Sequence, residues 1–170
     1  KDKTNKLYEM KDILSQQRVI TNMYFDKNQA MVTLSDIPTD PLTIAGVFKA
    51  LGKSGVIIDI ITQNSAANSG ANISFSLSKE ELGKAENAMN SFISDLRGAK
   101  KTIFKDITKI TVEGMGMNRH SGVAARLFSA LALDNISIKL ISTSETKIAF
   151  CVESDDSRKA LSLISKTFDI

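Results

Sequence analysis

The sequence predicts an α+β fold of two ferredoxin-like βαββαβ units in tandem, interleaved, with antiparallel sheets that carry their helices on one face. Two observations predict it. The chain repeats itself at a fixed offset, and the second copy of the repeat lacks a strand while a spare strand precedes the first copy. With 170 residues, of which 42% are hydrophobic and 24% charged, the chain has the length and composition of one or two packed domains.

The repeat aligns residues 42–64 with residues 122–144 at an offset of 80 residues, without a gap. Two phenylalanines and several alanines coincide as well as the apolar positions, so the match goes beyond general hydrophobicity. Residues 73–77 and 148–152 continue the match five residues out of step. The chain therefore contains two copies of one supersecondary unit.

Each copy has the pattern of strand, helix, strand, strand and helix, because runs of branched residues alternate with apolar residues at helical spacing. In the first copy these elements are expected at 30–37, 42–54, 56–63, 72–78 and from Ser78 onward. In the second copy they are expected at 109–114, 122–133, 136–143, 147–153 and 155–168. Ser78 and Glu81 have the spacing of a capping box. Gly55 and Asn135 are expected to end the first helices in left-handed turns.

The strand count predicts that the two units are interleaved. Residues 101–106 give the first copy a fourth strand, whereas the second copy ends after its last helix and lacks one. A spare strand at 18–25 precedes the first copy, and we expect it to complete the second. The expected domains are residues 28–106 and residues 18–27 plus 107–170, after a polar leader or linker at 1–17.

Composition argues against several classes of function. One cysteine and one histidine leave no disulfide framework and no cluster of metal ligands, so we predict neither a metal site nor catalytic residues. No apolar run approaches the ~20 residues of a membrane span. The polar start shows no signal peptide, so we expect a cytoplasmic protein without a membrane partner.

Nucleic acid is not an expected partner either. The net charge of +3 is dispersed along the chain. Phe75 and Phe150 alternate in phase with branched residues, so they should face the helices. The other face of the first copy then shows Ser74, Ser76 and Ser78, which cannot stack on bases as exposed aromatic side chains do.

Five segments carry a family resemblance: ITNMYFDKNQAMVTL, IIDIITQN, ANISFSL, VEGMGMNRHSGVAARLFSAL and ISIKLISTSETKIAF. Together they resemble the C-terminal regulatory region of aspartate kinase, or its separate regulatory small subunit, which is a tandem of ACT domains. The resemblance covers about residues 18–168. In the first copy the loop differs, because Pro41-Leu42-Thr43 stands where the family usually has Pro-Gly-Glu or Pro-Gly-Val.

The resemblance implies a regulatory module that binds lysine, threonine or both and thereby feedback-inhibits the ATP-dependent phosphorylation of aspartate. It also implies a homodimer formed through ACT domains, and the aspartate kinase catalytic domain or subunit as a partner. No counterpart of that catalytic domain is found in these residues, so we expect this chain not to be an enzyme by itself. ATP and magnesium are expected only in the catalytic domain, and no cofactor in this chain. The alternative is an ACT-like interaction module that dimerises without a ligand.

The resemblance further implies two effector sites, each at the loop before the first helix of one ACT domain and facing the second strand of another. Free N–H groups at a helix N-terminus suit the carboxylate of an amino acid, and carbonyls or short polar side chains suit its ammonium group. The first site is expected to comprise Thr39, Leu42, Thr43, Ile44 and Gln63, facing Ser137 and Ile138. The second is expected to comprise Asn118, Ser121, Gly122, Val123, Ala124 and Ser144, facing Ile57 and Ile58.

Two further expectations concern these surfaces. The second site should bind more strongly, because it keeps a glycine, Gly122, where the first has Leu42. Ile57 and Ile61 alternate away from the core, and this exposed apolar surface favours a homodimer. The residues do not discriminate between lysine and threonine, because the loops bind the backbone that all amino acids share.

Overall fold

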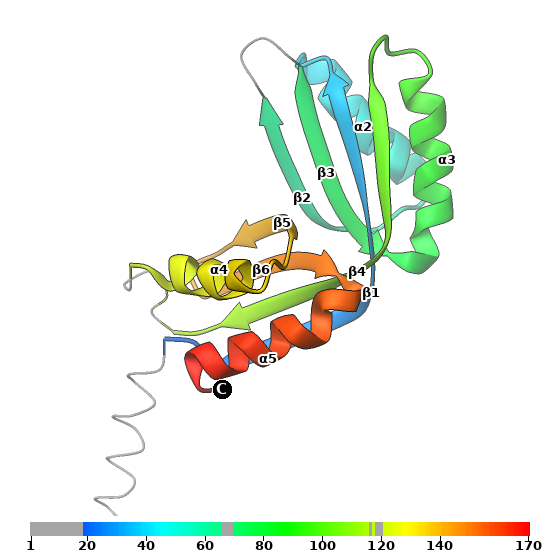
Figure 1. Ribbon diagram of the computed structural model, residues 1–170. Coiled ribbons are helices and arrows are strands. Elements are labelled where there is room, and N and C mark those ends of the chain that lie inside the picture. The colour runs from blue at the N-terminus through cyan, green and yellow to red at the C-terminus, as the bar shows by residue number, and fades with distance from the viewer. Residues whose placement is uncertain (1–18, 66–69, 116, 118–120) are drawn as a thin grey trace, which may run out of the picture. The chain divides into compact units, whose positions relative to one another are not determined.

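The computed structural model describes residues 19–65, 70–115, 117 and 121–170 (Figure 1). The expected leader at 1–17 lies outside these residues. The chain forms the α+β fold predicted from the sequence, and its described residues contain an antiparallel sheet and four α-helices. In chain order the elements are β1 (Asn22–Ile37), α2 (Pro41–Lys53), β2 (Ile58–Ser65), β3 (Ala71–Ser78), η1 (Lys79–Glu81), α3 (Leu82–Ile93), β4 (Lys100–Glu113), α4 (Val123–Leu133), β5 (Ile138–Thr143), β6 (Lys147–Glu153), η3 (Ser154–Asp156) and α5 (Ser157–Phe168).

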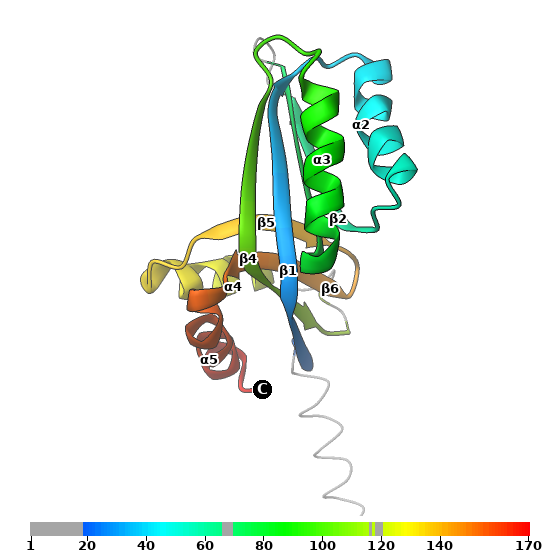
Figure 2. The same cartoon turned by 90° about the vertical axis from the view of Figure 1, so that its right-hand side faces the viewer.

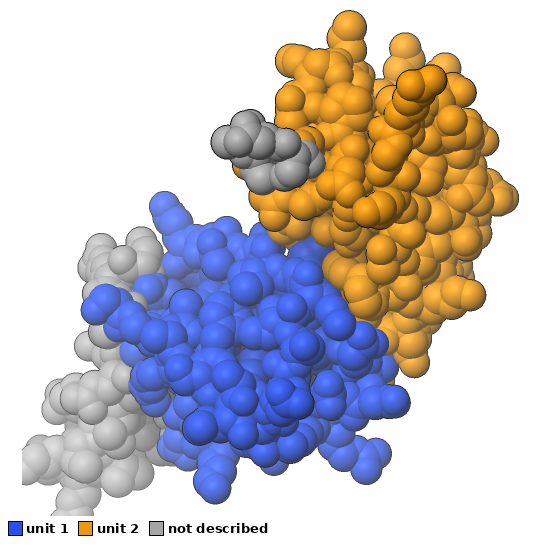
Figure 3. Space-filling model, turned by 45° about the horizontal axis from the view of Figure 1, so that its top comes forward, with its two compact units in different colours: residues 1–25, 109–170 blue, residues 26–108 orange. Residues whose placement is uncertain are grey.

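The chain divides into two compact units (Figure 3). Residues 26–108 form one, here called the central unit and coloured orange. Residues 19–25 and 109–170 form the other, here called the split unit and coloured blue. The strand order β2-β3-β1-β4-β6-β5 gives each unit four strands, because β1 and β4 contribute to both. The interleaved fold predicted from the strand count is therefore confirmed.

The two shared strands are longer than the sequence analysis expected. The sequence predicts separate strands at 18–25 and 30–37, but residues 22–37 form the single strand β1. Residues 100–113 likewise form the single strand β4, where separate strands at 101–106 and 109–114 are predicted. Neither β1 nor β4 contains a glycine or proline that would break an extended chain. Gln29, Ile107 and Thr108, near the points where the units divide, are buried. The backbone there stays paired rather than turning through solvent.

Each unit has its own core beneath two helices. In the central unit, Phe75 packs with Val47, Leu51 and Met89 under α2 and α3, which lie on the same side of the strands (Figure 2). In the split unit, Phe150 packs under α4 and α5, and its ring lies 5.8 Å from that of Phe128 at 85°. Both phenylalanines therefore face the helices, as predicted.

The turns after the first helices also agree with the sequence analysis. Gly55 has a φ of 68° and Asn135 a φ of 57°, the left-handed conformation expected at both positions. Val56 N–H then donates to Leu51 O at 3.1 Å, and Ile136 N–H donates to Leu131 O at 3.0 Å. These bonds close the helix ends, so β2 and β5 begin two residues later than expected.

Two local predictions are wrong. Ser78 makes no side-chain cap to the 3-10 turn η1, and Glu81 accepts the N–H of Ile57 at 3.3 Å instead of completing a capping box. The chain enters α3 through that turn, and Glu81 is the residue that directly precedes α3. Ser76, expected on the open face, is fully buried, and its hydroxyl accepts the N–H of Ile60 at 3.2 Å where β2 bulges.

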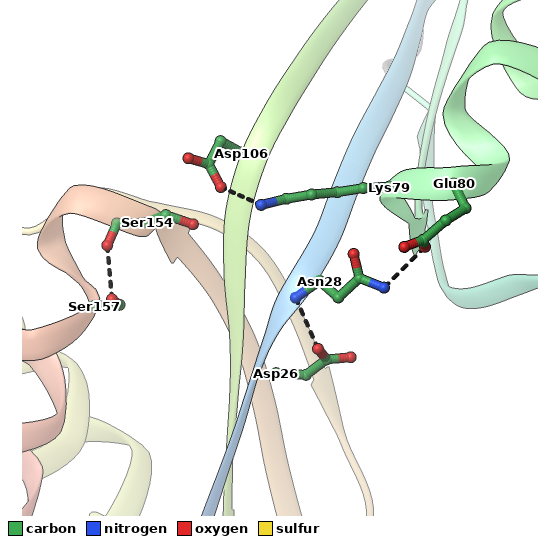
Figure 4. Close-up of polar contacts among 7 residues, drawn as sticks. All are labelled: Asp26, Asn28, Lys79, Glu80, Asp106, Ser154 and Ser157. Atoms are coloured by element: carbon green, nitrogen blue, oxygen red, sulfur yellow. Dashed lines mark hydrogen bonds and ion pairs between the residues drawn. The ribbon is translucent and has the colours of Figure 1, made fainter.

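Side chains hold η1 to the neighbouring strands of the central unit (Figure 4). Lys79 Nζ lies 2.5 Å from Asp106 Oδ1 on β4. Asn28 Nδ2 on β1 donates to Glu80 Oε2 at 2.8 Å, and this bond keeps the pKa of Glu80 below its ordinary value. The start of α3 is therefore fixed to both shared strands.

The N-terminal segment closes the split unit by a very close approach. Ile20 is buried in the core of that unit, and Thr21 N–H donates to Glu113 O at 2.8 Å. A Cβ atom built on Gly114 would lie 1.7 Å from Val19 O. Only glycine at position 114 lets the two backbones lie this close.

We therefore predict that Gly114→Ala destabilises the protein by about 2–4 kcal/mol, because the segment before β1 must move away from its core. Chemical denaturation measures the free energy of unfolding. Gly83→Ala is the matched control, since a Cβ at this helical position contacts nothing within 4 Å. This change should raise stability by roughly 0.5–1 kcal/mol. Equal stability of the Gly114 variant and the parent would contradict the seating of residues 19–21.

Candidate functional site

Helix α4 begins with N–H groups that have no partner within the helix itself. Gly122 precedes it with a φ of 89°, a left-handed conformation that favours glycine. Arg126 N–H makes the first bond within the helix, to Gly122 O at 2.9 Å. Among the described residues, no side chain caps this helix, and no hydrogen bond involves the N–H groups of Val123, Ala124 and Ala125. The helix therefore presents N–H groups at its positive end that no side chain of the described residues caps.

A pocket of about 210 Å³ lies at these donors. Its walls combine the start of α4, the hydroxyl side chains that end β5, and an apolar surface from the loop before α4 and from β6. The lining residues are Met117, Gly122, Val123, Ala124, Thr143, Ser144 and Ile148. The pocket thus brings main-chain donors, hydroxyl groups and apolar side chains together within a single unit.

Hydrogen bonds fix the turn that carries the hydroxyl groups. Ser144 N–H donates to Lys147 O at 2.8 Å, and Ser144 Oγ accepts the N–H of Lys147 at 3.2 Å. Because that oxygen is the acceptor, the proton of the hydroxyl remains for a ligand. Gly114 N–H donates to Thr146 O at 2.9 Å, which holds the turn to the end of β4.

Three polar side chains, linked to one another, support the same turn. Lys147 Nζ lies 3.2 Å from Glu113 Oε1, and Tyr24 Oη donates to Glu113 Oε2 at 2.9 Å. The Tyr24 hydroxyl and the Lys147 ammonium hold the pKa of Glu113 below its ordinary value, and the bond to Glu113 raises the pKa of Tyr24. β1, β4 and β6 are thereby linked beside the pocket.

The structure brings together most of the residues expected at the second site. Gly122, Val123, Ala124 and Ser144 all line the pocket. Ser121 is exposed immediately before them, and Asn118 lies outside the described residues.

Three lining residues were not predicted: Met117, Thr143 and Ile148. Thr143 could have been found, because it stands at an offset of 80 from the predicted Gln63. Met117 and Ile148 gave no such signal, since they are buried apolar residues like many others in the chain.

The residues expected at the first site lie around a different kind of helix end. Asp40 caps α2: its Oδ1 accepts the N–H of Thr43 at 2.9 Å and its Oδ2 accepts the Thr43 hydroxyl at 2.6 Å. Leu42 is 84% exposed, whereas Ile44 packs against the core of the central unit. Thr39 and Gln63 are exposed, in the loop before α2 and on β2 respectively.

The residues expected to face the two sites stand at the start of the strands β2 and β5, which end the strand order. Ile57 is 77% exposed, and Ile58 packs on the core of the central unit. Ser137 is exposed, and Ile138 packs on the core of the split unit. That these residues face the sites stays a prediction.

The described part of the chain contains no group of three or more histidine, cysteine, aspartate and glutamate side chains able to hold a metal ion. Its one cysteine, Cys151, is buried. No helix in residues 19–65 and 70–170, as far as these are described, has the length and apolar character needed to cross a membrane.

Comparisons with known proteins agree on one family. The model of the ACT domain matches residues 110–168. Over 156 residues the chain is 28% identical to the aspartate kinase Ask_LysC of Stutzerimonas stutzeri, covering 91% of this chain and 38% of that protein. The chain thus spans well under half of the length of such curated relatives.

Solved structures match at nearly full length. The regulatory subunit of aspartate kinase from Thermus flavus has a TM-score of 0.81 and 27% identity, over 88% of this chain and 99% of that one. A chain in the structure of aspartokinase alpha and beta subunits has the same TM-score of 0.81 and 27% identity, over 89% of this chain and 99% of that one.

The cap on α2 predicts a measurable pH dependence. The Thr43 hydroxyl, and then the N–H groups of Thr43 and Leu42, hold the pKa of Asp40 below its ordinary value. The cap should therefore stabilise the fold above the ordinary pKa of aspartate, and this contribution should be lost as the pH falls through the lowered pKa. Thr43→Val should raise the pKa of Asp40, and Thr43→Ser should not, when carboxyl resonances are titrated by NMR. An identical Asp40 pKa in all three proteins would contradict this geometry.

Proposed function

Because this chain is a regulatory (ACT) region of the aspartate kinase type, we propose that it senses an end-product amino acid, lysine or threonine or both, and thereby feedback-inhibits the phosphorylation of aspartate. The single observation that carries the proposal is the pocket at the free end of α4. Feedback inhibition needs a site for a free amino acid that is separate from the reacting groups.

The groups around the pocket suit each part of an amino acid. Its carboxylate binds the N–H groups of Val123 and Ala124, which lie in the first turn at the positive end of α4. Its ammonium group binds oxygen atoms of Thr143 and Ser144, and its side chain lies toward Met117 and Ile148. The expected partners Ile57 and Ile58, from another ACT domain, complete the site.

The proposed partners follow from the same assignment. Aspartokinase alpha and beta subunits occur together in a solved structure whose chain resembles this one. We propose that this chain likewise associates with an aspartate kinase catalytic domain or subunit in the cytoplasm. ATP and magnesium bind in that catalytic part, and this chain itself neither catalyses nor holds a cofactor.

Inhibition requires that the effector bind the inactive arrangement of the whole enzyme more tightly than the active one, because equal affinity would shift no equilibrium. An effector held between two ACT domains does this by stabilising one way of pairing them. A coupling free energy of ~1–3 kcal/mol is typical of such pairs of sites. The substrates must then weaken effector binding by the factor by which the effector weakens theirs.

Calorimetric titration of the full chain with lysine and with threonine tests the proposal. Gly122→Asp places a negative charge beside the effector carboxylate, which should weaken binding by about 3 kcal/mol, roughly a hundredfold. Gly122→Asn is the matched control, since asparagine adopts the same left-handed backbone without the charge. It should lose clearly less affinity than the Asp variant.

Leu42→Asp tests the ranking of the two sites. It should matter less than Gly122→Asp, since Leu42 already replaces the glycine of the family loop. Binding that is lost in the Leu42 variant and kept in the Gly122 variant would reverse the ranking. Failure of the unaltered chain to bind either amino acid would favour the ligand-free dimerisation module.

Apolar side chains on the terminal strands support the proposed homodimer. Ile61 on β2 is 50% exposed, and Ile141, its counterpart in the repeat, is 40% exposed on β5. Exposed edge strands pair readily with other chains, and lysine on an edge opposes this pairing. Sedimentation in the micromolar range should show a dimer for the parent and a monomer for Ile61→Lys.

The matched control for this assembly is Leu133→Lys. Leu133 is 89% exposed, but it lies at the end of α4 rather than on an edge strand. Its substitution should leave the dimer intact. A monomeric parent, with and without lysine and threonine, would contradict the proposed assembly.

A further inference from the structure

The two copies of the repeat begin their first helices differently, although they align without a gap. In the central unit the residues are Asp40, Pro41, Leu42 and Thr43. At an offset of 80 the split unit has histidine, serine, glycine and valine at positions 120–123. Only the central unit thus has a carboxylate, a residue without an N–H group and a bulky side chain at these positions, which are Asp40, Pro41 and Leu42.

The N–H groups at the start of α2 already donate hydrogen bonds within the chain. Pro41, the first residue of the helix, has no N–H group. Thr43 N–H donates to Asp40 Oδ1 at 2.9 Å, and Ile44 N–H donates to Asp40 O at 3.2 Å. The Thr43 hydroxyl donates to the other carboxylate oxygen at 2.6 Å. Asp40 therefore holds, within the chain, the donors that would bind the carboxylate of a free amino acid.

The start of α4 is the opposite case. Its first bond within the helix comes from Arg126, and the N–H groups of the three residues before it have no partner among the described residues. Gly122 leaves the approach open, because a Cβ built there contacts nothing within 4 Å. Among the described residues, the same position of the repeat thus carries a carboxylate cap in the central unit and no side-chain cap in the split unit.

We propose that Asp40 acts as a built-in substitute for the effector carboxylate, so that the α2 site is closed to free amino acids and each chain binds one effector, at α4. This inference rests on the proposed function and makes Asp40 the residue that sets the stoichiometry. An ordinary helix cap would stabilise α2 in the same way, but its removal would not create a binding site. The Asp40 carboxylate is charged at neutral pH, where it also repels a second carboxylate.

The stoichiometry of binding tests this inference in the full chain. Titration calorimetry with threonine, and separately with lysine, should give one site per chain in the parent. Asp40→Gly removes the carboxylate while keeping a residue that is tolerated at a helix cap, and it should add a second site per chain. Asp40→Asn is the matched control: its side-chain oxygen still accepts the N–H of Thr43 without a charge, so it should keep one site.

Two sites per chain in the parent would overturn the inference, as would one site in both the parent and a folded Asp40→Gly variant. A second site in Asp40→Asn would also overturn the inference. The side-chain oxygen of that variant still accepts the N–H of Thr43, so this hydrogen bond would then not be what closes the α2 site. If Asp40→Gly does not fold, the amide resonance of Thr43 in the parent decides: it should stay unchanged under saturating threonine or lysine, and a large shift would refute the closed site.

Failure of the proposed function has a different signature. A parent that binds nothing, together with an Asp40→Gly variant that binds one effector and keeps it after Gly122→Asp, would refute the α4 site and support the role of Asp40. Absence of binding in every variant would refute both. Binding of one effector in the parent and in Asp40→Gly would refute the inference alone.

Discussion

The backbone at Gly114 lies so close to Val19 that no side chain fits between them, and the split unit depends on this approach. The contact seats the segment before β1 beside β4, so that the unit has the fourth strand that its own repeat copy lacks. Gly114 also donates its N–H to Thr146, in the turn that carries Thr143 and Ser144. A single position therefore joins the closing strand, the shared strand β4 and the wall of the pocket.

Duplication has given the chain two similar helix starts with opposite chemistry. At α4 a left-handed glycine precedes the helix beside a pocket and no side chain of the described residues caps it, whereas at α2 an aspartate caps the helix. The proposed sensor follows from the first arrangement and the proposed stoichiometry from the second. Since an effector can shift an equilibrium only by its difference in affinity for two states, one open site per chain limits the regulation to what that site can distinguish.

Much of this fold could be predicted because its information is local and repeated. Apolar spacing located the helices, and Gly55 and Asn135 located their ends. Counting strands was enough to predict interleaving. The sequence did not predict that β1 and β4 are each continuous. The two segments of each strand have separate apolar patterns, and they form one strand only because both lie in the same sheet. The burial of Ser76 was missed because it depends on an irregularity in the pairing of β2 with β3, where the Ser76 hydroxyl accepts the N–H of Ile60.

The candidate site was predicted unevenly for related reasons. Gly122, Val123, Ala124 and Ser144 were named through the family resemblance and the repeat, and the pocket joins them. Thr143 was missed although the offset of the repeat pointed to it. Asp40 before Pro41 is a common start of a helix, but the sequence does not reveal which donors that carboxylate holds. Only the distances to Thr43 distinguish an occupied helix end from an open one.

The most direct test of the account is amide hydrogen exchange at the start of α4, measured for the full chain with and without threonine and lysine. The amides of Val123 and Ala124 lie in the first turn of α4 and have no partner within the helix, so they should exchange faster than the helix interior in the free protein. Saturation with the effector should slow their exchange strongly while the interior of α4 changes little. Rapid exchange of both amides under conditions where an amino acid demonstrably binds would contradict the central claim, because the ligand would then lie elsewhere.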